Sequence, residues 1–131
     1  ILSGLVGSEM CIRDRLSLEL HQPLAELAQR NLQANGVVNA EVRCADGSKA
    51  AAIEGQFDVI VLSGSVAKLP LDLIEKLAPG GRLAAIVGDS IMMRATIVTR
   101  SVDTPQASTR QPWDTIAPRL VGFVEPSRFQ F

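Results

Sequence analysis

The chain has 131 residues, with 13 lysines and arginines against 14 aspartates and glutamates, so its formal net charge at pH 7 is −1. This balance offers no basic surplus for phosphate backbones, and we expect no nucleic-acid partner. Hydrophobic residues make up 47% of the chain, which excludes general disorder, and the length suits one domain. The longest aliphatic runs, at 59–62 and 83–87, are too short to cross a bilayer, so no membrane partner is expected.

The two cysteines, Cys11 and Cys44, form neither a disulfide framework nor a metal site by their spacing. Unpaired thiols are typical of the reducing cytosol, and residues 1–15 do not read as a signal peptide. We therefore expect a cytoplasmic protein. His, Cys and carboxylate residues show no metal-ligand spacing, so no metal site is expected.

Residues 1–15 differ in character from the rest of the chain. They show neither a helical nor a strand period. The string LVGSEMCIRDR, which ends at Arg15, resembles a translated sequencing adapter. We expect residues 1–15 to be a non-native, disordered segment, with a natural frayed N-terminus as the alternative. The folded domain is then expected over residues 16–131.

From Leu16 onward, strand and helix patterns alternate. Residues 16–20 alternate apolar and polar side chains, and Gln22-Pro23 is typical of a helix start. Asn35-Gly36 is typical of the left-handed end of that helix. The other expected elements are strands at 40–44, 57–62 and 82–87, a helical turn at 49–53, a helix around 71–77, and late strands at 94–100 and within 113–124.

This order predicts an α/β fold, in which a sheet of mostly parallel strands is covered by helices. A polar loop at 101–112, without a helix pattern, separates the two late strands, which favours an antiparallel C-terminal pair. In open α/β sheets, ligands bind at the carboxyl ends of the strands. The candidate site residues are therefore those at or just beyond the end of each expected strand.

Glu19 is the strongest candidate, because a carboxylate at a strand end can accept both hydrogen bonds of a ribose diol. A solvated surface acid is the alternative. Asp46-Gly47 can bring an acceptor close to an adenine amino group, with an ordinary turn as the alternative. His21 can be read as a general base, but we favour a capping or packing role. Ser63 does not lie in the nucleophile motif G-x-S-x-G.

A glycine-rich turn between a strand and a helix is expected ahead of the ribose-binding acid in such sheets. Upstream of Glu19, Gly4 and Gly7 form the one glycine pair, and they leave too little chain for a helix and a strand. This pair is therefore not interpreted as a cofactor loop.

These features, in this order, resemble the S-adenosylmethionine-dependent class I methyltransferases, and within them the protein-L-isoaspartate O-methyltransferases. The likeness covers residues 16–131. It is carried by the stretches 18–20, 24–28, 39–43, 45–47, 57–64, 77–83 and 126–129. The resemblance implies a Rossmann-like sheet of order 3-2-1-4-5-7-6, of which this chain begins at strand 2, so that the class I methyltransferase sheet is incomplete.

The resemblance also implies S-adenosyl-L-methionine as the cofactor of the intact parent. By likeness to the family, the cofactor-binding residues are Glu19, Leu20, Asp46, Gly47 and Ser63, and the substrate-binding residues are Val87 and Gly88. The family's glycine motif and an active-site hydroxyl residue belong upstream and are missing, so we expect no catalytic residue within the chain.

The activity implied for the parent is methylation of isoaspartyl carboxylates in damaged proteins, a repair reaction with isoaspartyl proteins or peptides as partners. A carboxylate is already an anion at neutral pH, so the reaction needs no strong general base. The alternatives are a class I methyltransferase with another acceptor, or a non-catalytic nucleotide-binding α/β domain. Without the central first strand, we expect weak or absent cofactor binding, unpaired strand edges and little activity from this chain alone.

Overall fold

The computed structural model describes residues 2–8, 11–52, 54–89 and 91–126, with side chains from residue 15 onward except at 50–52. Its strands are β1 (Leu2–Ser8), β2 (Cys11–Glu19), β3 (Ala40–Cys44), β4 (Phe57–Val66), β5 (Leu77–Gly88), β6 (Met93–Arg100) and β7 (Ala107–Asp114). Its helices are α1 (Gln22–Ala34), the short 3-10 helix η1 (Gly47–Ala52) and α2 (Leu71–Glu75). No helix among the described residues is long and apolar enough to span a membrane.

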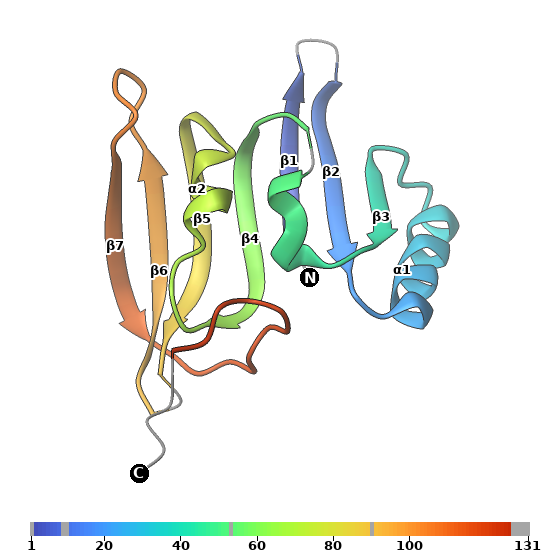
Figure 1. Ribbon diagram of the computed structural model, residues 1–131. Helices are drawn as coiled ribbons and strands as arrows, with labels where there is room; N and C mark the ends of the chain where they lie inside the picture. The colour runs from blue at the N-terminus through green and yellow to red at the C-terminus, as the bar shows by residue number, and fades with distance from the viewer. Residues whose placement is uncertain (1, 9–10, 53, 90, 127–131) are drawn as a thin grey trace.

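The strands form one sheet of order β3-β2-β1-β4-β5-β6-β7 (Figure 1). Strands β2, β3, β4, β5 and β7 run in one direction, whereas β1 and β6 run in the other. In the part of the chain that the structure describes, the prediction of an α/β fold with an antiparallel C-terminal pair is confirmed; β2–β3 and β4–β5 are its parallel pairs, and the other neighbouring strands pair antiparallel. The carboxyl ends of β2 to β5 meet at one edge of the sheet (Figure 1).

Strand β1 fills the position between β2 and β4 that we expected to be empty. Over the described residues 2–8 and 11–15 the structure differs from the expected disorder, because Leu2 pairs with Leu18 of β2 and with Leu62 of β4; residues 1, 9 and 10 lie outside the described residues. The pairing of β1 with β2 is antiparallel because two residues separate the strands and a parallel neighbour needs a much longer crossover. Strand β1 is then also antiparallel to β4, which runs in the same direction as β2. The hairpin gives the backbone groups of β2 and β4 partners on their facing edges. The non-native origin of residues 1–15 stays a prediction.

The last two strands depart from the order that the resemblance implied. Strand β6 lies beside β5, and β7 lies at the edge of the sheet. Residues 89–92 alone connect β5 to β6, and such short connections favour antiparallel neighbours. The expected strand within 113–124 was wrong in position, because β7 ends at Asp114. Every side chain of β7 is exposed, so no apolar pattern marks it, and an edge strand tolerates Pro112.

The helix predictions hold in their main features. Helix α1 has Pro23 in its first turn and ends at Asn35, and Gly36 follows with φ of +67°. The side chain of Gln29 donates a hydrogen bond of 2.7 Å to the carbonyl of Val42, which ties α1 to β3. The core packs on one face of the sheet, where fully buried side chains meet: Ile60, Leu73, Leu77, Leu83 and Val98.

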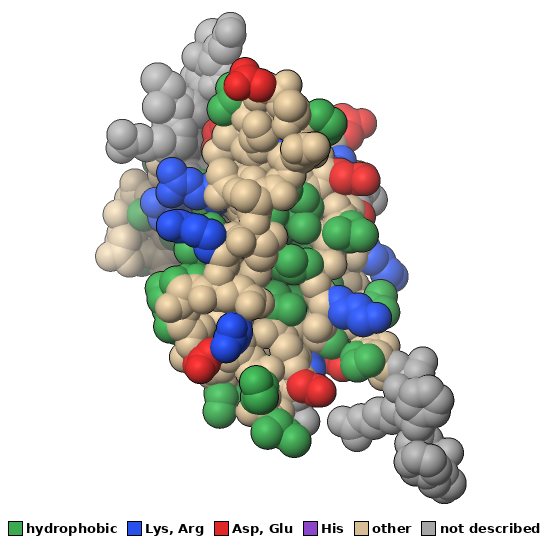
Figure 2. Space-filling model, turned by 90° about the vertical axis from the view of Figure 1, so that its left-hand side faces the viewer, with side chains coloured by type: hydrophobic (Ala, Val, Ile, Leu, Met, Phe, Trp, Pro, Cys, Tyr) green, Lys and Arg blue, Asp and Glu red, His purple; other side chains and the backbone are tan. Residues whose placement is uncertain are grey.

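The opposite face of the sheet is partly open. Side chains alternate between the two faces of a strand, so Val61, Ala84 and Ile97, which are paired in register, lie away from the buried Ile60. They line an apolar groove of about 280 Å³ together with Trp113, which is 60% exposed. Figure 2, which views the molecule from the β7 side, shows hydrophobic side chains at the surface among charged ones.

Candidate functional site

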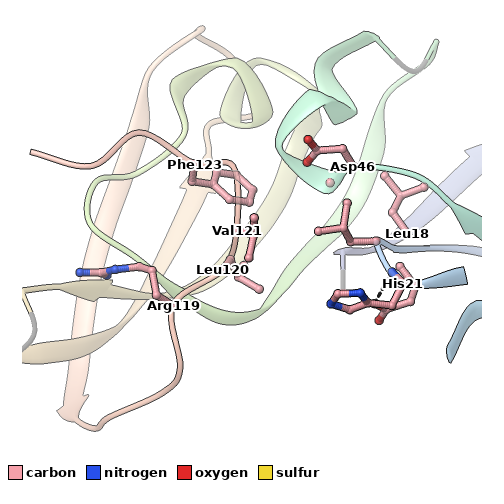
Figure 3. A pocket seen from close by; sticks show the side chains of 10 residues that line it. Leu18, His21, Asp46, Arg119, Leu120, Val121 and Phe123 are labelled. Atoms are coloured by element: carbon pink, nitrogen blue, oxygen red, sulfur yellow. Dashed lines mark hydrogen bonds between the residues drawn. The ribbon is translucent and has the colours of Figure 1, made fainter. Parts of the chain in front are cut away.

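A cavity of about 210 Å³ opens at the sheet edge where β2 and β3 end. One wall comes from the ends of these strands, and the other comes from the segment that follows β7 (Figure 3). The lining residues are Leu18, Glu19, Leu20, His21, Asp46, Gly47, Arg119, Leu120, Val121 and Phe123.

Glu19 is the last residue of β2, and it lines this cavity. The residue is 9% exposed, and its Oε1 accepts a hydrogen bond of 3.0 Å from the backbone N–H of His21. A carboxylate carries two oxygens, so a second acceptor remains for a ligand. Glu19 is therefore a fixed, nearly buried acceptor at a strand end.

His21 is the N-cap residue of α1 by position, but its side chain makes no capping hydrogen bond, so the capping interpretation holds for the backbone alone. Its carbonyl oxygen accepts hydrogen bonds from the backbone N–H groups of Leu24 and Ala25, at 3.1 and 3.0 Å. The imidazole lies beside the cavity (Figure 3). The start of α1 thus fixes the backbone N–H that in turn orients Glu19.

Asp46 follows β3 and lies in the same cavity wall as Leu18 (Figure 3). Its Oδ1 accepts hydrogen bonds from the hydroxyl and the backbone N–H of Ser48, at 2.6 and 2.9 Å. These hydrogen bonds, with a smaller contribution from the charge of Lys49, hold the pKa of the Asp46 carboxyl below its ordinary value. Asp46 is therefore an anion at neutral pH and an acceptor for a ligand donor.

The far wall of the cavity is a segment that sequence reasoning did not assign to the site. The backbone of Ser65 in β4 donates to the carbonyl of Pro118 and accepts from the N–H of Leu120, both at 2.8 Å. Gly122 has φ of +89°, and a Cβ there would lie 2.7 Å from the hydroxyl oxygen of Ser48. Leu120 and Phe123 pack against the core cluster. The apolar residues after Pro118 predicted a strand, and in the structure these residues form the far wall of the cavity.

The structure brings together four of the predicted site residues and leaves three apart from them. Glu19, Leu20, Asp46 and Gly47 all line the cavity. Ser63 lies in β4 with its side chain exposed, outside the lining of this cavity. Val87 and Gly88 end β5, where the carbonyl of Gly88 accepts a hydrogen bond from the guanidinium of Arg119. Arg119 thus connects the β5 end to the cavity wall.

Comparison with known sequences agrees with the family resemblance described above. The family described as protein-L-isoaspartate(D-aspartate) O-methyltransferase matches residues 1–113. A protein-L-isoaspartate O-methyltransferase of Methanospirillum hungatei is 39% identical over 93 residues, which are 71% of this chain and 43% of that protein. Its counterpart in Pyrococcus abyssi is 43% identical over 75 residues, 57% of this chain and 35% of that protein. The chain thus spans less than half the length of these relatives.

Solved structures show the same fold. A crystal structure of a protein-L-isoaspartate O-methyltransferase from Plasmodium falciparum, in complex with S-adenosyl-L-homocysteine, aligns with a TM-score of 0.65 at 17% identity. The alignment covers 80% of this chain and 51% of that one. A second protein-L-isoaspartate O-methyltransferase structure aligns with a TM-score of 0.70 at 22% identity, over 82% of this chain and 34% of that one. At these identities the alignments support the fold alone.

Proposed function

Because the chain belongs to the protein-L-isoaspartate O-methyltransferase family, we propose that it is part of an enzyme that methylates isoaspartyl carboxylates of damaged proteins. Residues 16–131 are then the C-terminal part of the methyltransferase domain; a foreign origin of residues 1–15 stays a prediction from the adapter-like string, because the family match itself begins at residue 1. The observation that carries this proposal is the cavity in which Glu19 and Asp46 meet from the ends of neighbouring parallel strands. Isoaspartyl proteins as partners and a cytoplasmic location belong to the same proposal.

The cavity suits the nucleoside half of S-adenosyl-L-methionine. Glu19 supplies a nearly buried carboxylate for the ribose hydroxyls, and Asp46 supplies an acceptor for the adenine amino group. Leu20 and Phe123 offer apolar contact to the base, and Gly47 lets the base approach the backbone. The volume of about 210 Å³ lies below the range of about 300–1,000 Å³ that is usual for drug-sized ligands. These residues therefore fit a nucleoside rather than the whole cofactor.

The direction of β1 explains why no glycine-rich turn lies at this edge of the described sheet to bind the rest of the cofactor. A glycine-rich turn binds its ligand when the strand before it ends at the site edge. Strand β1 starts at this edge, with Leu2 opposite Leu18, and it ends at Ser8 on the opposite edge. We therefore expect this chain to bind the cofactor weakly.

The cofactor, when bound, supplies a methyl group on a sulfonium. The chain's task is to hold the acceptor carboxylate in line and to keep water away, which raises the rate without a general base. We assign this task to the turn at Val87 and Gly88, and we assign to Ser63 a place facing the cofactor from β4. In this chain the side chain of Ser63 is exposed and lies outside the lining of the cavity.

The test uses the parent enzyme with isotope-labelled S-adenosyl-L-methionine and a short isoaspartyl peptide. The matched control is the same peptide with a normal aspartyl residue. Transfer of label to the isoaspartyl peptide alone is expected. Label on a different acceptor indicates a class I methyltransferase with another substrate. No binding of any adenosyl ligand indicates a non-catalytic α/β domain, and either result contradicts the proposal.

A further inference from the structure

The guanidinium of Arg119 lies where the segment after β7 crosses the ends of β4 and β5. Its Nη1 donates hydrogen bonds to the carbonyl of Gly88 at 2.9 Å and to the hydroxyl of Ser65 at 3.4 Å. A parallel bridge between Ser65 and Arg119 fixes the backbone on which this side chain stands. The guanidinium is therefore held at the turn that we assign to the acceptor.

A carboxylate already lies on this guanidinium. The Oε1 atom of Glu125 is 2.8 Å from the Nε atom of Arg119. The side chain of Arg119 is 27% exposed and that of Glu125 is 52% exposed. Ion pairs with this much exposure contribute little to stability, so another carboxylate can take the place of Glu125 at small cost. Glu125 thus shows where a ligand carboxylate fits.

The acceptor in the proposed reaction is itself a carboxylate. Arginine recognises carboxylates through N–H donors in a fixed planar geometry, and this makes it a specific partner for them. A carboxylate has two oxygens, so one can stay on the guanidinium while the other is presented to the methyl donor. The guanidinium of Arg119 therefore matches the acceptor in charge and in geometry.

The same cavity region repels a carboxylate elsewhere. Glu19 and Asp46 line the other wall, whereas Arg119 is the single lysine or arginine among the described lining residues. In Figure 3 the Arg119 side chain extends away from Asp46. The structure thus separates an acidic wall suited to a nucleoside from a cationic position at Gly88.

We propose that Arg119 is a substrate-binding residue, which anchors the free carboxylate of an isoaspartyl polypeptide beside Gly88. Glu125 occupies this position in the free chain and competes with the acceptor for it. This inference rests on the proposed function, because that function defines the acceptor. It adds a specificity residue and an internal competitor to the site.

The test is a titration of the chain with a short isoaspartyl peptide whose ends are blocked, so that its one carboxylate is that of the isoaspartyl residue. Binding is followed in ¹H–¹⁵N spectra, including the Nε–H signal of Arg119. The Arg119→Gln variant is expected to bind about tenfold more weakly, since it loses a charged hydrogen bond. The Glu125→Gln variant is expected to bind about threefold more tightly, since it loses the competitor. Arg119→Lys is expected to lie between wild type and Arg119→Gln.

Two controls separate carboxylate recognition from a general effect on the fold. The same peptide with its carboxylate converted to an amide is expected to bind wild type, Arg119→Gln and Glu125→Gln equally. Arg110→Gln, a change of an exposed arginine on β7, is expected to leave the affinity for the isoaspartyl peptide unchanged. If Arg119→Gln loses its native spectrum, the opposite shifts expected for Glu125→Gln and Arg119→Lys still decide the matter.

The inference is overturned if Arg119→Gln binds the isoaspartyl peptide like wild type, if Glu125→Gln weakens binding, or if wild type does not bind the peptide. A parallel titration with adenosine keeps this failure distinct from failure of the proposed function. If adenosine shifts the signals of Glu19 and Asp46 while Arg119→Gln binds the isoaspartyl peptide like wild type, the inference alone is overturned. Absence of any adenosine shift, together with no transfer of label to the isoaspartyl peptide by the parent enzyme, contradicts the proposed function itself.

Discussion

Glu19 and Asp46 line one cavity from the ends of two neighbouring parallel strands. The register pairs Glu19 with Cys44, and Asp46 follows two residues later at the same sheet edge. The N–H of His21 orients one carboxylate, whereas Ser48 orients the other. The two acids are thus fixed independently and can accept hydrogen bonds from different groups of one nucleoside.

Replacing Glu19 with Gln is expected to weaken adenosine binding about tenfold, because the charged acceptor for the ribose hydroxyls is lost. The affinity is measured by titration in ¹H–¹⁵N spectra. Glu41→Gln is the matched control, since Glu41 is an exposed acid on β3 that pairs with Arg43 outside the cavity. Equal weakening in both variants contradicts a specific role for Glu19.

Replacing Ser48 with Ala is expected to raise the pKa of Asp46 toward its ordinary value, because the hydroxyl that stabilises the carboxylate is removed. A lowered native pKa contributes stability above the unfolded value of about 3.9, and this stability is lost as the pH falls through the native pKa. The variant therefore shows a smaller loss of stability below about pH 4. The carboxyl signal of Asp46 in a pH titration reports the shift.

The carboxyl of Glu41 serves as the internal reference in that titration. Its pKa is lowered by the hydrogen bond from Arg43, which Ser48 does not touch. An unchanged pKa for Asp46 in the Ser48→Ala variant, or an equal rise for Glu41, goes against this account.

Replacing Gly122 with Ala is expected to destabilise the fold by about 2 kcal/mol, through a positive φ and a contact with Ser48. Gly55→Ala is the matched control, because Gly55 also has a positive φ, of +98°, but nothing lies within 4 Å of the added Cβ. Thermal unfolding measures both variants. Gly122→Ala is expected to have the lower melting temperature. Equal losses of stability in the two variants contradict packing of this segment against Ser48.

Replacing Ser3 with Pro in β1 is expected to destabilise the chain by about 3 kcal/mol, because β1 has neighbours on both sides and proline removes a backbone donor. Ser3→Ala keeps the donor and is the control. Chemical denaturation of both variants gives the free energies of unfolding. If Ser3→Pro unfolds like wild type, β1 does not hold the centre of the sheet.

Much of the fold follows from local patterns in the sequence. The strand at 40–44 and the start and end of α1 were predicted because apolar spacing, Pro23 and Gly36 act within a few residues. Glu19 and Asp46 were found because strand ends of a parallel sheet meet at one edge. Their proximity needs only the direction of two strands, which an alternating strand–helix order specifies.

Other features depend on contacts that the local pattern does not contain. Strand β1 forms because two neighbouring edges need backbone partners, a demand that its own residues do not reveal. Strand β7 is an exposed edge strand, so it lacks an apolar period. Arg119 was missed because its role comes from Ser65 and Gly88, which are distant in sequence. Contacts between segments that are distant in sequence, rather than local secondary-structure propensity, determine these features.

Titration of the chain with adenosine and with S-adenosyl-L-homocysteine tests the central claim most directly. The account predicts that both ligands shift the amide signals of Glu19, Leu20, Asp46 and Gly47, with similar and weak affinities, on the order of 1 mM. The similarity follows because the cavity holds the nucleoside alone. Micromolar binding of S-adenosyl-L-homocysteine, or adenosine shifts confined to other residues, contradicts it.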